Sequence, residues 1–123
     1  MKELEQIFKA LADTTRLRIL NLLLHGELCV CDIQFVLDSP QPNVSRHLTY
    51  LKNAGLVQDR REGPRIYYCL AQATTGVYRD LFSFLRQLFT QSKVLKGDLR
   101  RLNKAIERGS CHAYKRRSSP LLT

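Results

Sequence analysis

Two cysteines stand one residue apart in the stretch ELCVCDIQ, and an aspartate directly follows the second. Thiolates are soft ligands that favour soft metals and metalloids over magnesium, calcium or manganese. A pair at this spacing is compatible with packing of two small apolar side chains, with a thiol redox pair, or with part of a metal site. Cys29 and Cys31 are therefore the first candidate ligands of this chain.

A regular helix would keep these two thiols apart. Successive residues of an α-helix are rotated by about 100°, so residues two apart point about 200° away from each other. Cys29 and Cys31 can share one ion only where the chain is extended or the start of a helix is distorted. Binding of an ion is then expected to reshape that helix start. A disulfide between them would close a small strained ring, so we expect a stable one to be disfavoured.

The elements around the pair follow from periodicity and turn residues. Apolar residues recur every three or four positions, as in amphipathic helices, and residues 13–15 (DTT) supply N-cap chemistry. Near residue 56 the pattern changes to two strand-like runs around a Gly-Pro turn. The sequence predicts helices over 4–12, 16–24, 30–37 and 43–53, strands over 56–61 and 65–70, and one long helix or two in series beyond Gly76, with Gly97 as a candidate break.

This order predicts a mostly α fold with a small β-hairpin, arranged as a winged helix-turn-helix. Residues 1–108 would form one DNA-binding and dimerisation domain, and residues 109–123 a basic, flexible tail. The chain has 123 residues, 44% of them hydrophobic, which suits one ordinary core without a cofactor for folding. It has no membrane-spanning run and no signal peptide, so we expect a cytoplasmic protein with reduced thiols.

The second helix of the predicted pair would enter the major groove of double-stranded DNA. Arg, Asn and Gln side chains can contact bases in a bidentate manner, and Ser can bind a base or a phosphate. The same run would also suit the polar face of an ordinary surface helix, but the helix pair, the turn and the basic hairpin together favour DNA binding. The candidate base-reading residues are Gln41, Asn43, Ser45, Arg46 and His47.

Arginines also gather at the predicted hairpin. Arg60, Arg61 and Arg65 suit phosphates or a minor groove, where cations add affinity rather than sequence reading. Basic and acidic residues cancel over residues 1–58, so residues 59–123 carry the whole formal charge of +9. Such an asymmetry indicates a polyanionic partner. The cations of residues 100–108 are expected to form a solvated helix face.

Four motifs resemble a known family. ALADTTRLRIL, ELCVCDI, SPQPNVSRHLTYLKNAGLV and RREGPRIYYCL follow one another in the order and spacing of the arsenic-responsive repressor family (ArsR/SmtB), over roughly residues 4–90. The resemblance implies a homodimer with the first and last helices at its interface. It also implies a metalloid-responsive transcriptional repressor, which binds operator DNA until a metal or metalloid releases it.

Within that family, the motif ELCVCD resembles the sensing site for As(III) or Sb(III), and for cadmium or lead in some members. The arsenic branch often adds a cysteine where this chain has Gln34. The cadmium and lead branch uses N-terminal cysteines, and none precedes Cys29 here. Cys111 is then the candidate third ligand, from the same or the partner subunit, and two thiolates alone are the alternative. Cys69 is expected to pack in its strand. Zinc is a weaker candidate, because the last helix lacks the His and acid spacing of the family's zinc sensors.

Other functions remain as alternatives. A cadmium, lead or thiol-redox sensor would have the same fold. A small thiol enzyme is disfavoured, since the sequence has no Cys-x-x-Cys pair, no catalytic His and Asp grouping and no phosphate-binding glycine loop. A protein-binding module that does not bind DNA is disfavoured by residues 45–47 and by the hairpin arginines.

Overall fold

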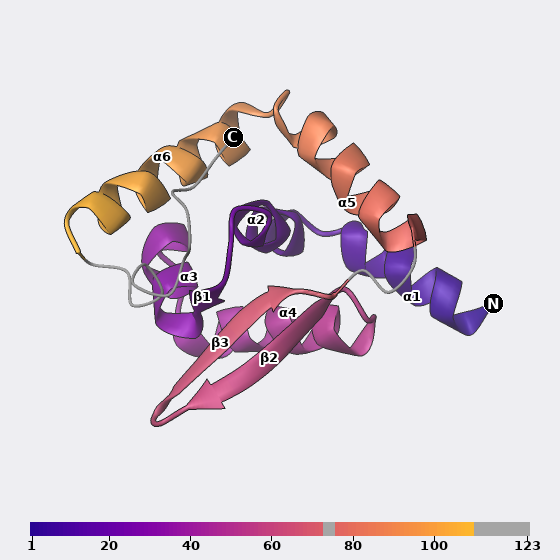
Figure 1. The fold of residues 1–123 in the computed structure, drawn as a ribbon, viewed down its shortest axis with the longest axis horizontal. Coiled ribbons are helices and arrows are strands. Elements are labelled where there is room, and N and C mark those ends of the chain that lie inside the picture. Colours follow the sequence, from indigo (N-terminus) through magenta and orange to yellow (C-terminus); the bar gives the residue numbers. More distant parts are fainter. Residues whose placement is uncertain (73–75, 110–123) are drawn as a thin grey trace.

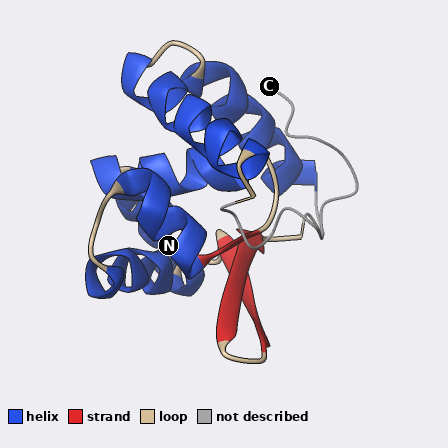
Figure 2. Cartoon of the chain, turned by 90° about the vertical axis from the view of Figure 1, so that its left-hand side faces the viewer, coloured by secondary structure: helices blue, strands red, loops and turns tan. Residues whose placement is uncertain are grey.

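The computed structural model describes residues 1–72 and 76–109. The helices form one body, and a small antiparallel sheet lies at its edge, from which the long hairpin projects (Figures 1 and 2). In chain order the elements are α1 (Lys2–Leu11), α2 (Thr14–Leu23), β1 (Leu28–Cys29), α3 (Val30–Leu37), α4 (Gln41–Asn53), β2 (Val57–Glu62), β3 (Arg65–Leu70), α5 (Gly76–Phe89) and α6 (Lys93–Glu107). The predicted mostly helical class with a β-hairpin is confirmed.

The core is built around α2, which lies at the centre of the molecule (Figure 1). Its side chains pack against α3, α4, α6 and strand β3. The largest side chains that are fully buried are aliphatic, together with one tyrosine: Ile19, Leu20, Leu22, Leu28, Ile33, Val36, Val44, Leu48, Leu51, Leu56, Tyr67 and Leu102. Because α3 and α4 share this core, a shift of one is transmitted to the other through close packing.

The sheet has a third strand that the sequence did not predict. Its strand order is β1-β3-β2, with both pairs antiparallel. β1 contains only Leu28 and Cys29, which lie opposite Tyr68 and Tyr67 of β3. Two residues are too few to show an alternating pattern, so only the pairing defines this strand. The consequence is that the first cysteine is part of the sheet that carries the hairpin.

The boundaries of α2, α3 and α4 are close to the predicted ones. Asp13 is the N-cap of α2, and its side chain accepts a hydrogen bond from the backbone N–H of Arg16 at 3.0 Å. α3 covers the predicted span and ends at Asp38, whose φ of 52° is left-handed. α4 begins at Gln41, two residues before the predicted start. Pro42 fits there, because the first turn of a helix does not need its N–H.

The predicted break at Gly97 is wrong. α5 ends at Phe89 and α6 begins at Lys93, so Gly97 lies inside α6. Ser92 caps α6 by accepting a hydrogen bond from the backbone N–H of Leu95 at 3.2 Å. The serine N-cap determines where α6 begins, whereas a helix interior tolerates a single glycine such as Gly97 at a cost of about 1 kcal/mol.

Polar contacts fix α6 to α2. Arg18 donates from Nε and Nη2 to the carboxylate of Asp98 at 2.8 and 2.9 Å. These hydrogen bonds raise the pKa of Arg18 against the opposing effect of burial. The side chain of Asn21 donates to the carbonyl of Leu95 at 3.0 Å. Among the described residues, no helix is both long enough and apolar enough to cross a membrane.

Candidate functional site

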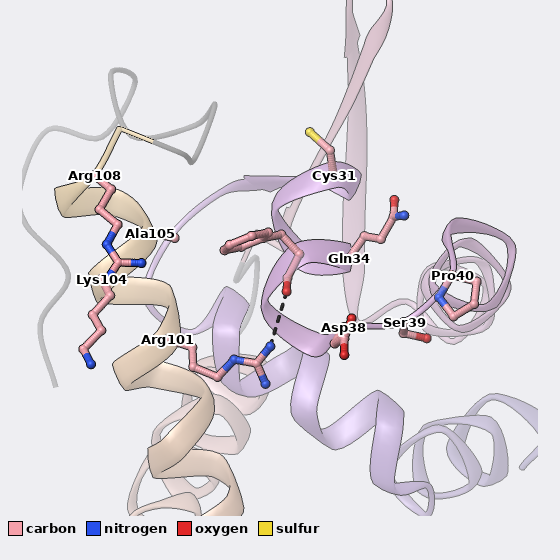
Figure 3. Close-up of a pocket in the computed structure, with 10 residues that line it drawn as sticks. Cys31, Gln34, Asp38, Ser39, Pro40, Arg101, Lys104, Ala105 and Arg108 are labelled. Atoms are coloured by element: carbon pink, nitrogen blue, oxygen red, sulfur yellow. Dashed lines mark hydrogen bonds between the residues drawn. The ribbon is translucent and has the colours of Figure 1, made fainter.

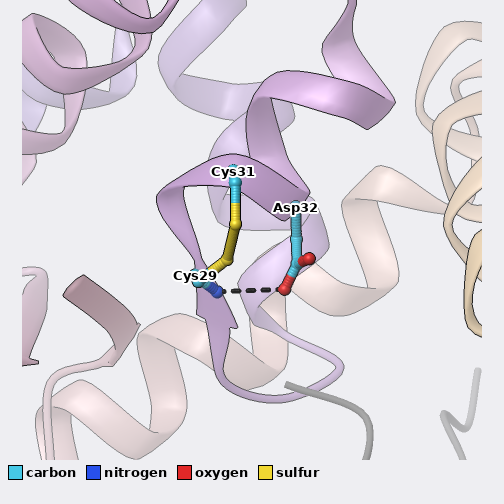
Figure 4. Close-up of a disulfide and its surroundings, with 3 residues drawn as sticks. All are labelled: Cys29, Cys31 and Asp32. Carbon is cyan, nitrogen blue, oxygen red and sulfur yellow. Dashed lines mark hydrogen bonds between the residues drawn. A yellow bond between two sulfur atoms is a disulfide. The ribbon is translucent and has the colours of Figure 1, made fainter. Parts of the chain in front are cut away.

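The cysteine pair lies where β1 becomes α3. Cys29 is the N-cap of α3 with extended backbone (φ −81°, ψ 162°), and Cys31 lies in the first turn. Their sulfur atoms are joined in a disulfide, with 5.4 Å between the Cα atoms (Figure 4). The condition that the sequence set for a shared ligand, an extended chain at this point, is met. The two sulfur atoms come together there, while the expectation that a stable disulfide is disfavoured stays a prediction. The extended N-cap turns both side chains to one side, at a Cα separation that disulfides commonly have.

Asp32 completes this group, and the sequence analysis did not assign it a role. Its carboxylate is almost fully buried and accepts a hydrogen bond from the backbone N–H of Cys29 at 3.1 Å. Asp32 and Cys29 form a capping box at the start of α3 (Figure 4). An acid three residues after an N-cap is a capping signal that ELCVCD does contain. The ligand atoms of Cys29, Cys31 and Asp32 all lie within 4.8 Å of one another.

The donor set of this group suits a soft ion. Once the disulfide is reduced, two thiolates, one at the N-cap and one in the first turn of α3, face the same side. Such sulfur ligands favour arsenic, antimony, cadmium or lead over hard cations. Cys69 is not in the group. It lies half-buried in β3, where burial and the nearby Glu27 raise the pKa of its thiol while Arg60 opposes them. Cys111, the predicted third ligand, lies outside the described residues.

The thiol pair is close to the predicted DNA-binding elements. A small groove of about 250 Å³ is lined by both cysteines, by Gln41 and Ser45 of α4, and by Arg65 at the start of β3. α3 also packs directly against α4, and Cys29 lies in register with Tyr67 of β3. The candidate ligands therefore lie beside the predicted reading helix, α4, and beside the hairpin.

The N-terminal half of α4 presents a polar surface. Val44, Leu48 and Leu51 anchor the helix in the core, and the other faces carry the predicted reading residues. Gln41 donates to the hydroxyl of Ser45 at 2.6 Å, and the exposed Arg46 donates to Asn43 at 2.6 Å.

The structure joins these four predicted residues in two pairs, Gln41 with Ser45 and Asn43 with Arg46. Thr49 is also exposed and follows Arg46 by three positions, so it lies on the same face of α4. Thr49 could not be predicted from the sequence, because nothing in its residue type or spacing distinguishes it from other surface threonines.

His47 faces the interior side of α4 instead. Its Nδ1 lies 3.3 Å from Nη1 of Arg16 and 3.7 Å from the carboxylate of Asp13, both at the start of α2. Burial lowers the pKa of His47, and the charges of Arg16 and Arg46 lower it further, while Asp13 raises it. The structure therefore separates this predicted DNA contact from the two hydrogen-bonded pairs of α4.

The three hairpin arginines are in different environments. Arg60 donates two hydrogen bonds to the carboxylate of Glu27, at 2.8 and 2.6 Å, and one to Glu62 at 2.7 Å. Its guanidinium also lies 4.7 Å from the centroid of the Tyr67 ring. Arg61 and Arg65 are exposed, and their side chains have no hydrogen bond or ion pair with any described residue. Only these two cations are unneutralised at the hairpin tip.

Comparisons with known proteins agree with this arrangement. Residues 13–59 match the model of the family described as bacterial regulatory protein, arsR family. Over 67 residues the chain is 52% identical to the arsenical resistance operon repressor of Escherichia coli (strain K12), covering 54% of this chain and 57% of that protein. Over 69 residues it is 45% identical to a cadmium resistance transcriptional regulatory protein CadC homolog of Staphylococcus aureus, covering 55% and 57%. The chain thus matches little more than half the length of these curated relatives.

A solved structure extends the likeness beyond that segment. The homodimeric winged helix-turn-helix DNA-binding domain Mb0332 from Mycobacterium bovis, described as a possible ArsR-family transcriptional regulator, has a TM-score of 0.62 and 36% sequence identity. The superposition covers 71% of this chain and 78% of that one. The predicted winged helix-turn-helix architecture is confirmed.

Proposed function

The chain belongs to the arsR family of bacterial regulatory proteins, and from this premise we propose that it is a metalloid-responsive transcriptional repressor. It binds operator DNA as a homodimer and leaves the DNA when As(III) or Sb(III) binds cysteine thiolates. The observation that carries the proposal is the group of Cys29, Cys31 and Asp32, packed against both the reading helix and the hairpin sheet. The names of the arsenical and cadmium resistance relatives support the class of inducer.

In the proposed complex, the exposed face of α4 lies in the major groove. Arg46, Gln41 and Ser45 reach base edges or phosphates, with Asn43 orienting the guanidinium of Arg46. The unneutralised Arg61 and Arg65 contact the phosphate backbone. We assign His47 a supporting role, since its ring lies against α2 and holds α4 in position.

The proposed inducer would be held by the thiolates of Cys29 and Cys31, with Cys111 as the proposed third ligand. Binding releases DNA only to the extent that the inducer prefers the DNA-free conformation. Asp32 couples the two events, because its carboxylate accepts the hydrogen bond of the Cys29 backbone and so shapes the start of α3. A change there reaches α4 through core packing, and reaches the hairpin through the β1–β3 pairing.

The proposed dimer would use α1 and the last helices. Leu4 and Phe8 of α1 are 49% and 65% exposed, and Phe84 and Leu88 of α5 are 58% and 46% exposed. Each pair is spaced i, i+4 and so forms one apolar stripe. α1 and the beginning of α5 lie at the same end of the molecule's long axis (Figure 1). We expect Phe8→Ser to convert dimer to monomer in sedimentation. The equally exposed Phe35→Ser on α3 should leave the dimer intact.

The central experiment follows binding of fluorescently labelled DNA from upstream of the coding region, by anisotropy under reducing conditions. Arsenite and antimonite should release the parent protein. They should not release the Cys29→Ser, Cys31→Ser variant, whereas Cys69→Ser should respond like the parent. If arsenite, antimonite, cadmium, lead and zinc all leave the DNA bound, metal and metalloid sensing is wrong.

Two variants sharpen this experiment. Arg46→Gln should abolish specific binding, while Arg79→Gln, an exposed arginine of α5, removes the same charge and should have little effect. Cys111→Ser tests the third ligand, and a weakened arsenite response supports three thiolates. An unchanged response leaves two thiolates as the site.

The disulfide favours a second candidate function, thiol-redox sensing by the same fold. An external disulfide or peroxide would accept two electrons and two protons from the two thiols. The bond so formed would change the start of α3 without any metal. This function requires DNA affinity to differ between the oxidised and reduced proteins, measured without metal. Equal affinities in both states would exclude it.

A further inference from the structure

A second and larger groove lies on the other side of the cysteine pair. It has a volume of about 830 Å³ and runs between α3 and the C-terminal half of α6 (Figure 3). On the side of α3, the groove is lined by Cys31, Phe35 and Asp38. On the opposite side, it is lined by Arg101 and Lys104 of α6 and by Arg108, the C-cap of that helix. A cavity of this size can hold a small organic molecule.

The wall formed by α6 is cationic. Arg101, Lys104 and Arg108 are exposed and follow one another at i, i+3 and i+7, so they share one face of the helix. Arg101 donates to the carbonyl of Phe35 at 3.5 Å, while the side chains of Lys104 and Arg108 have no hydrogen bond or ion pair with the described residues. Asp38 is the acidic residue among the lining residues. The charge of the groove therefore suits an anionic ligand.

The two sulfurs of the disulfide differ in access. Cys29 is only 1% exposed, whereas Cys31 is partly exposed and lines the cationic groove. A nucleophile in the groove can thus reach Cys31 and not Cys29. The thiolate that leaves in such an attack, Cys29, is the N-cap of α3, where the helix dipole stabilises negative charge.

We propose that this groove is a docking site for a small anionic thiol that reduces the Cys29–Cys31 disulfide. The thiolate of the ligand attacks the sulfur of Cys31, the Cys29–Cys31 bond breaks, and its electron pair leaves on Cys29, which takes a proton from water. A second thiolate attacks the ligand's sulfur in the mixed disulfide and frees Cys31. Two external thiols are oxidised to one external disulfide, and the protein gains two thiols.

This activity goes beyond the proposed repression, although it supplies the two thiolates that the proposed inducer needs. Positive charge near the attacked sulfur raises the local concentration of an anionic thiolate and increases its rate of encounter. The same charge offers no such gain to a neutral thiol. Cationic thiols should be repelled from the groove.

The test compares reduction of the oxidised full-length protein by glutathione, 2-mercaptoethanol and cysteamine. The reaction is quenched by alkylation, and the thiols of Cys29 and Cys31 are counted by peptide mass spectrometry. Each rate is divided by the rate of the same thiol with a small uncharged disulfide, which removes differences in intrinsic reactivity. The groove variant Lys104→Gln, Arg108→Gln is matched by Arg79→Gln, Arg100→Gln, which loses the same charge outside this groove.

We expect the normalised rate of glutathione to exceed that of 2-mercaptoethanol by about tenfold. The advantage should vanish between about 0.01 M and about 1 M salt, as the Debye length falls from about 30 Å to about 3 Å. It should also be lost in the groove variant but kept in the matched control, with the mixed disulfide on Cys31.

Equal normalised rates, equal losses in both variants, a mixed disulfide on Cys29, or a pair that stays reduced after oxidation by diamide would each overturn the proposal. DNA release by arsenite is measured on reduced protein, so its failure would be seen separately.

Discussion

The ion pair between Arg18 and Asp98 should respond unequally to removal of its two partners. Asp98 is 4% exposed and Arg18 is 25% exposed, and two hydrogen bonds at 2.8 and 2.9 Å join them. In Arg18→Gln a carboxylate stays buried without its cation, which typically costs about 3–5 kcal/mol. In Asp98→Asn the guanidinium can turn toward water, and the loss is closer to that of charge-assisted hydrogen bonds, about 2 kcal/mol.

Urea unfolding at 25 °C and a fixed protein concentration measures both values, since a dimer's stability depends on concentration. Arg100→Gln, an exposed neighbour on α6, should change the free energy of unfolding by no more than about 0.5 kcal/mol. The double variant should lose less than the sum of the single losses, because it leaves no unpaired charge. An Asp98→Asn protein that is as unstable as Arg18→Gln, or less stable, would refute the reasoning from unequal burial.

Three further predictions concern the hairpin, the reading helix and the thiols. Arg61→Gln should weaken binding to every DNA sequence and reduce the slope of the logarithm of the binding constant against the logarithm of the salt concentration by about 1. Arg60→Gln should change that slope less, because carboxylates already neutralise Arg60. The pKa of His47 is lower in the folded protein than its ordinary value of 6.5, so between these two pH values the unfolded chain binds more protons than the folded one. The free energy of unfolding should therefore decrease as the pH falls from about 7 toward the folded-state pKa. His47→Gln should flatten this part of the pH profile of stability, measured by urea unfolding. In the reduced protein, iodoacetamide should label Cys69 more slowly than Cys31 at pH 8, because burial raises the pKa of the Cys69 thiol. Mass spectrometry of the two peptides gives both labelling rates. Equal rates would contradict this prediction.

The spacing of apolar residues along the chain made the helical part of the fold predictable. The repeating apolar positions of α1 to α4 and the N-cap at Asp13 are local signals, and the helices formed close to the predicted spans. β1 was missed because a two-residue strand exists only through its partner β3. The break before α6 depended on the cap at Ser92, which competed in the sequence with the more conspicuous Gly97.

The candidate site was predictable as a set of residue types but not as a set of environments. Arg60, Arg61 and Arg65 look equivalent in the sequence, yet Arg60 is paired with Glu27, which lies 33 positions away. His47 follows Arg46 directly but contacts α2, because the helical rotation between neighbours turns it inward. The convergence of Cys29 and Cys31 depended on one extended residue before α3.

The neutralisation of Arg60 by Glu27 and Glu62 has a consequence for how such a repressor would search a genome. Each free cation at the hairpin strengthens binding to every stretch of DNA alike, including the roughly 10⁶–10⁹ competing sites around one operator. A third free arginine would slow the search by holding the protein at wrong positions. In the proposed repressor, the internal pairing of Arg60 limits this indiscriminate attraction and leaves discrimination to the side chains of α4.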